Sequence, residues 1–174
     1  NTAFYHTEPH HDDIMLGYLP AVVRHVRLSS NSHHFVNMTS GFTAVTDDFL
    51  QEQVSALRTH LRTPAFRSMF EDGYFEPENS LGRNRDVWQY LDGVAADDQA
   101  AKREGAARRT LRNLIEVYDC EDLAAVEERM DEVEQYLRQC YPGEKNRPDV
   151  QKLKGMCREY EADCLWGYFG WNHS

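Results

Sequence analysis

The run TAFYHTEPHHDDIMLGYLPAVVRHVRLSSNSHHFVNMTSG, residues 2–41, sets the architecture that we predict for this chain. It opens with a β-prone segment at 2–6, continues through an apolar-rich helical segment at 14–28, and returns to a β-prone segment at 34–39. Pro20 interrupts the helical segment, so we expect a helix to begin, end or kink there. Strand, helix and strand in this order predict a parallel β-α-β unit, with its loops and chemistry at the carboxyl ends of the strands.

The sequence that follows is mostly helical in pattern. Asp48 can cap one helix, and a second is expected to start after 97–98. The most regular stretches are 123–140 and 150–164, where apolar residues recur at alternating spacings of three and four. Proline and glycine lie between these two stretches, so we predict that they form an antiparallel helical hairpin of bundle type.

Two segments interrupt this helical pattern. Residues 64–85 are rich in aromatic residues and contain glycine and proline, which predicts an ordered loop. Residues 168–171 resemble the opening of another strand or a strand-bound loop. The predicted fold class is therefore α/β, with part of a parallel sheet and a large all-helical insertion.

Composition limits the function. The 174 residues suit one core, and 19 Lys and Arg against 29 Asp and Glu give a net charge of -10, which disfavours nucleic acid and anionic membranes as partners. No apolar run approaches the length of a membrane span, and the first residues lack the pattern of a secretion signal. The four cysteines form no Cys-x-x-Cys pair, so we expect reduced thiols and a soluble, cytoplasmic chain.

The densest set of polar ligands is the segment 8–13, between the first strand and the helix. Imidazole and carboxylate together suit zinc, and the spacing of His10 and Asp13 lets both side chains turn toward one point, with Asp12 beside them as a base. The alternative is that Asp12 or Asp13 only caps the helix. Four further histidines are weaker candidates: His33, His34 and His60 are expected at the surface or at a strand edge, and His25 is given no role.

Three segments resemble the PIG-L/LmbE-like zinc N-deacetylase family. Residues 9–13, followed by 15–17, are similar to its motif of Ala or Pro, His, Pro, Asp, Asp and Glu. Residues 39–41 resemble its Thr-x-Gly, and 158–167 resemble the helix ahead of its third strand. The chain is especially similar to the C-terminal part of long bacterial glucosamine-6-phosphate deaminase/isomerase-like proteins.

The resemblance implies a Rossmann-like (LmbE-like) α/β domain formed by 1–46 and 149–174, with 47–148 as a helical insertion within the same domain. It also implies zinc-dependent removal of an N-acetyl group from an N-acetylglucosamine-type sugar. Carried onto this sequence, His10 and Asp13 are metal ligands and Asp12 is the catalytic general base. The expected partners are an amino-sugar small molecule and either a second copy of the chain or a fused isomerase domain.

The sequence departs from the family in its ligand set. Ile14 stands where the family has Glu, His11 stands where it has Pro, and the downstream His-x-x-His element that supplies the third ligand is absent. The one histidine after His60 is His173. We therefore expect a fragment of the domain that is inactive by itself and binds zinc weakly. The alternative function is a non-catalytic oligomerisation or docking module attached to a sugar-phosphate isomerase domain.

Overall fold

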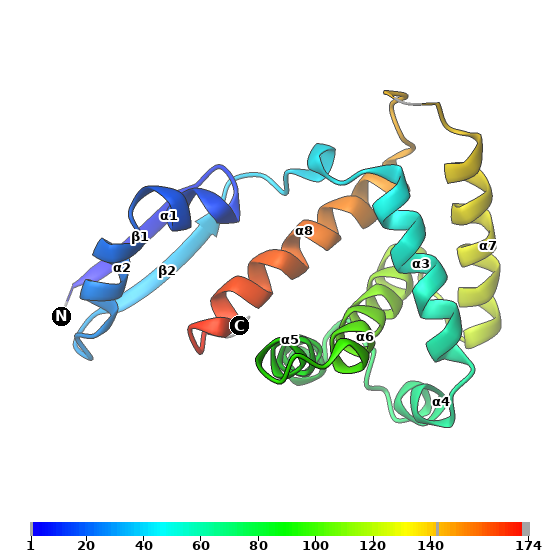
Figure 1. Ribbon diagram of the computed structural model, residues 1–174, viewed down its shortest axis with the longest axis horizontal. Helices are drawn as coiled ribbons and strands as arrows, with labels where there is room; N and C mark the ends of the chain where they lie inside the picture. The colour runs from blue at the N-terminus through cyan, green and yellow to red at the C-terminus, as the bar shows by residue number, and fades with distance from the viewer. Residues whose placement is uncertain (1, 142, 172–174) are drawn as a thin grey trace. The chain divides into compact units, whose positions relative to one another are not determined.

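The computed structural model describes residues 2–141 and 143–171. Its contacts divide the chain into two compact units, Asn1–Gly41 and Phe42–Ser174 (Figure 1). The elements of the first unit are β1 (Ala3–Glu8), α1 (His11–Gly17), α2 (Leu19–Val26) and β2 (Ser32–Asn37). The elements of the second are η1 (Phe42–Ala44), α3 (Asp47–Leu61), α4 (Pro64–Glu71), α5 (Ser80–Ala95), α6 (Gln99–Tyr118), α7 (Leu123–Gln139) and α8 (Pro148–Tyr168).

The first unit confirms the predicted parallel pairing. β1 and β2 run parallel, in a register that places Ala3 opposite Ser32 and Glu8 opposite Asn37. The connection between them is helical and breaks near Pro20, which lies in the first turn of α2. Proline is tolerated there because backbone N–H groups in the first turn have no partner within the helix. Alternate β1 residues turn inward with the fully buried Ile14 of α1, so this small core lies on one face of the sheet.

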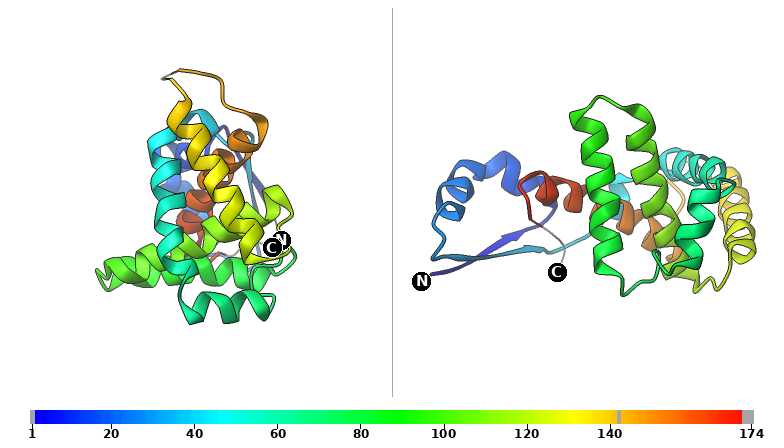
Figure 2. Two further views of the ribbon diagram at one scale, coloured as in Figure 1. Left: turned by 90° about the vertical axis from the view of Figure 1, so that its right-hand side faces the viewer. Right: turned by 90° about the horizontal axis from the view of Figure 1, so that it is seen from below.

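The second unit is built around α6, which packs against α3, α5, α7 and α8. α5 and α6 run side by side as an antiparallel pair (Figure 2). Their backbones approach closely at Gly105, where an added Cβ would lie 2.7 Å from the backbone nitrogen of Tyr90. The apolar stripes of these helices meet in one core that includes Leu57, Leu111 and Met130.

Buried charges hold α5, α6 and α8 together. Asp86 of α5 is fully buried and accepts hydrogen bonds from the Arg112 Nε and the Tyr74 hydroxyl, both at 2.9 Å. Arg109 of α6 donates to Asp163 of α8 at 2.7 Å. A buried charge without a partner is strongly destabilising, so these bonds fix the mutual positions of the three helices.

The predicted α/β class, a Rossmann-like sheet portion with a helical insertion, is wrong. The described residues contain one two-stranded sheet, and most of them are helical. The helices from 42 onward form a compact unit with a core of their own. The physical reason is that the apolar stripes of the helices bury one another, and so need no sheet to cover them.

Three local predictions also need correction. Residues 64–85 are not one continuous loop: Thr63 caps α4 and Asn79 caps α5, and residues 72–79 connect the two helices. Residues 168–171 are not a strand, because α8 continues through Tyr168 and ends in a turn. The predicted hairpin is replaced by a different packing, in which α7 contacts α3 and α6 while α8 contacts α5 and α6.

Within the described residues, no helix combines the length and apolar character that crossing a membrane requires.

Candidate metal site

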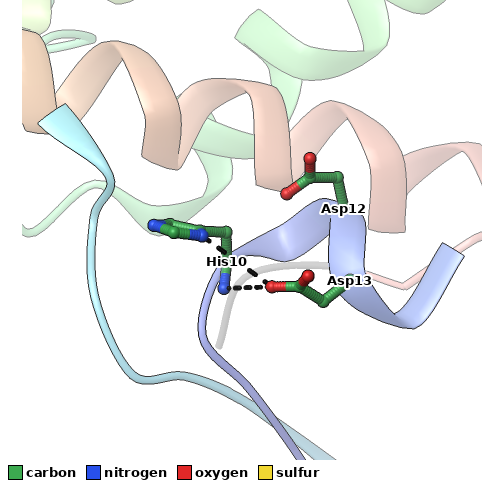
Figure 3. A group of neighbouring side chains, drawn as sticks. All are labelled: His10, Asp12 and Asp13. Carbon is green, nitrogen blue, oxygen red and sulfur yellow. Dashed lines mark hydrogen bonds and ion pairs between the residues drawn. The ribbon is translucent and has the colours of Figure 1, made fainter. Parts of the chain in front are cut away.

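The sequence-predicted site residues meet where β1 leads into α1. His10 precedes the first residue of α1, and Asp12 and Asp13 lie in its first turn. One potential ligand atom from each of the three side chains lies within 4.8 Å of the others (Figure 3). Among the residues that the structure describes, no other group of three or more His, Cys, Asp or Glu side chains converges in this way.

Asp13 is already engaged in helix capping. Its Oδ2 accepts a hydrogen bond from the His10 backbone nitrogen at 2.9 Å and lies 3.8 Å from the His10 Nδ1. Figure 3 shows the imidazole and the Asp13 carboxylate on the same side of the turn, with the Asp12 carboxylate nearby. The His10 and Asp13 side chains are 44% and 47% exposed, so an ion or a small molecule can reach them from solvent.

Glu8 lies beside this site, although the sequence analysis assigned it no role. Its side chain is 1% exposed, its Oε2 accepts a hydrogen bond from the Ile14 backbone nitrogen at 3.2 Å, and its Oε1 has no partner among the described residues. Burial raises the pKa of Glu8 to about 7, and the negative charges of Asp13 and Asp12 add to this shift. The period-two pattern of β1 is the signal that could have shown Glu8 to face inward.

The second predicted motif lies against the first. Both the Thr39 backbone nitrogen and its hydroxyl donate to the Pro9 carbonyl oxygen, at 3.1 and 2.9 Å. The Met38 backbone nitrogen donates to the Glu8 carbonyl oxygen at 2.8 Å. These bonds extend the β1–β2 pairing beyond the strands and tether the loop that carries His10.

Other histidines form a separate cluster on the inner face of the sheet. His6 Nε2 lies 3.0 Å from His33 Nδ1, and the His25 ring stacks on Phe4 at 4.9 Å. Burial lowers the pKa of His6, with further lowering from the charges that His33 and His25 would carry. This cluster is not grouped with His10, so it contributes no ligand to the candidate site.

The remaining predicted histidines also lie outside the site. His34 is exposed on β2, and His60 belongs to α3 of the second unit, where its ring packs 5.2 Å from that of Phe66. His173 falls outside the described residues.

The donor set suits zinc, which takes imidazole nitrogen and carboxylate oxygen and usually has three protein ligands in catalytic sites. If Asp12 serves as a base, only His10 and Asp13 of these three side chains remain as ligands for the metal. Comparisons with known proteins add no constraint on this assignment: no family model, curated protein or solved structure matches the chain.

Proposed function

We propose that the first unit carries the metal-binding part of a zinc-dependent hydrolase that removes an N-acetyl group from an N-acetylglucosamine-type sugar. The observation that carries the metal part of the proposal is the convergence of His10, Asp12 and Asp13 in one solvent-accessible turn. The choice of reaction and sugar follows from the resemblance of residues 9–13 and 39–41 to the PIG-L/LmbE-like motifs.

Each residue has one role in this proposal. His10 and Asp13 hold the metal, and the exposed Asp12 takes a proton from the attacking water and delivers it to the departing amine. A bound zinc ion supplies the Lewis-acid activation that amide hydrolysis needs. Glu8 and Thr39 position the turn, because Glu8 accepts from the Ile14 backbone and Thr39 donates to the Pro9 carbonyl.

The proposal places the protein in the cytoplasm, with an amino-sugar as its small-molecule partner. All four cysteines are free thiols, as a reducing compartment favours. Two ligands hold zinc weakly, so we propose that a further ligand from another segment or chain completes the site.

Zinc binding by the whole chain tests the proposal directly. Isothermal titration with zinc should give a site that is lost in His10→Ala and retained in Asp12→Asn, because the second change removes the base but no ligand. Asp48→Asn is the matched control, since Asp48 lies at the corresponding position in the first turn of α3. Equal zinc binding by wild type and His10→Ala would contradict the proposed site.

The second candidate function is a non-catalytic docking or oligomerisation module beside an isomerase domain. It is favoured by the helical unit, which has a core of its own and no part in the candidate metal site. In that case Asp12 and Asp13 serve α1 only as helix-terminal charges. Asp12→Asn and Asp48→Asn would then change stability to a similar, small extent, and wild type would bind no zinc.

A further inference from the structure

A pocket of about 380 Å³ lies within the helical unit and is lined by side chains of α3, α5, α6 and α8. The helices α3, α5 and α8 all pack on α6. Phe49 comes from α3, Thr110 and Asn113 from α6, and Cys157 and Tyr160 from α8. The volume is in the range of pockets that bind small organic molecules.

Asn113 gives the pocket a polar group in need of a partner. The side chain is 4% exposed, and its Oδ1 has no hydrogen-bond partner among the described residues. An unsatisfied buried acceptor is costly, so a site with such an acceptor favours a molecule that donates to it. The neighbouring Thr110 hydroxyl does not satisfy this acceptor, because it donates to the Ala106 carbonyl at 2.9 Å.

The charges around the pocket are compensated within the protein. The Arg109 guanidinium donates to Asp163 at 2.7 Å and stacks over the Tyr160 ring at 4.7 Å. Glu161 pairs with Arg158. Burial raises the pKa of the Cys157 thiol to about 12, so this thiol is neutral at physiological pH. An ion would gain little here, whereas an apolar ring would contact Phe49 and Tyr160.

We propose that this pocket binds an uncharged, planar, largely apolar small molecule that donates one N–H or O–H hydrogen bond to the Asn113 carbonyl. The compensated charges exclude a strongly ionic ligand, and the aromatic walls favour a ring. The proposal concerns the helical unit alone and is independent of the candidate metal site.

Indole and 1-methylindole form a matched pair of probes, because they share the ring and differ in the single N–H donor. Titration of the ¹⁵N-labelled chain with indole should shift amide signals of α3, α6 and α8 around the pocket. Wild type should bind indole about tenfold more tightly than 1-methylindole, the discrimination expected from one buried hydrogen bond.

Two variants separate the hydrogen bond from the pocket itself. Asn113→Leu should remove the preference for indole, because the acceptor is lost while an apolar wall remains. Ala106→Phe should abolish binding of both probes, because the new ring fills the pocket that Ala106 lines. Thermal melts will show that each variant is folded. Equal affinity of wild type for the two probes, shifts elsewhere in the chain, or no shifts at millimolar indole would each overturn the proposal.

Discussion

Each unit buries a carboxylate, but the two carboxylates differ in how many hydrogen-bond and ion-pair partners they have. Asp86, in the helical unit, is 0% exposed and accepts hydrogen bonds from Arg112 and Tyr74. Glu8, in the first unit, is 1% exposed, but one of its oxygens has no partner among the described residues. The helical unit thus uses buried charge to position its helices, whereas the first unit keeps a poorly compensated acid beside a cluster of candidate metal ligands. Poorly compensated buried acids are characteristic of functional sites.

Breaking the Asp86 network should have the largest effect on stability. Arg112→Met leaves the fully buried Asp86 with less compensation, so the free energy of unfolding should fall by about 3–5 kcal/mol. Chemical denaturation followed by helical circular dichroism measures this loss. Arg103→Met is the control, because Arg103 is an exposed residue of the same helix and should change stability by less than about 0.5 kcal/mol. Similar losses in both variants would show that the network contributes little.

The apolar core of the helical unit should be the next most sensitive feature. Leu137 of α7 is 5% exposed and belongs to the core cluster. Leu137→Ala should cost about 2–5 kcal/mol, the range for a leucine in a close-packed core. Leu81→Ala is the matched control, because Leu81 is 51% exposed. A denaturation midpoint for Leu137→Ala equal to that of the control would contradict the observed packing of α7.

The smallest expected effect, and the sharpest contrast between the units, is pH dependence. The folded-state pKa of Glu8 is raised to about 7 from an ordinary value of 4.5, so its ionisation opposes folding. The stabilisation from protonated Glu8 is fully present below pH 4.5 and is lost as the pH rises through about 7. Glu8→Gln should flatten this dependence.

Each unit contains one isoleucine, Ile14 in the first and Ile115 in the second. Their methyl NMR signals therefore report the unfolding of the two units separately during denaturation. In wild type, the Ile14 signal should report the pH-dependent loss, and the Ile115 signal should not. In Glu8→Gln, the remaining pH dependence of the first unit should come from His6, whose pKa is lowered. Neutral His6 stabilises the fold above about pH 6.5, and this stabilisation is lost as the pH falls. An unchanged pH profile of the Ile14 signal in Glu8→Gln would refute the role given to Glu8.

Local signals in the sequence predicted much of the first unit and the convergence of the candidate ligands in it. The β-prone residues at 2–6 and 34–39 located both strands, and Pro20 located the break between α1 and α2. The spacing of His10 and Asp13 predicted their convergence, because three residues span nearly one turn. Glu8 was missed because the predicted strand ended at residue 6, so the period-two pattern that turns Glu8 inward was not extended to it.

The sequence by itself determined which segments became helices with one apolar face, as in α3, α6, α7 and α8. Only the tertiary structure decided which faces met: α7 packs on α3 and α6, and the helices form a unit of their own. Periodicity follows from local backbone geometry, whereas the choice among similar apolar stripes depends on side-chain shape and on buried pairs such as Asp86 with Arg112. Residues 26 positions apart in sequence meet there only because two helices pack side by side.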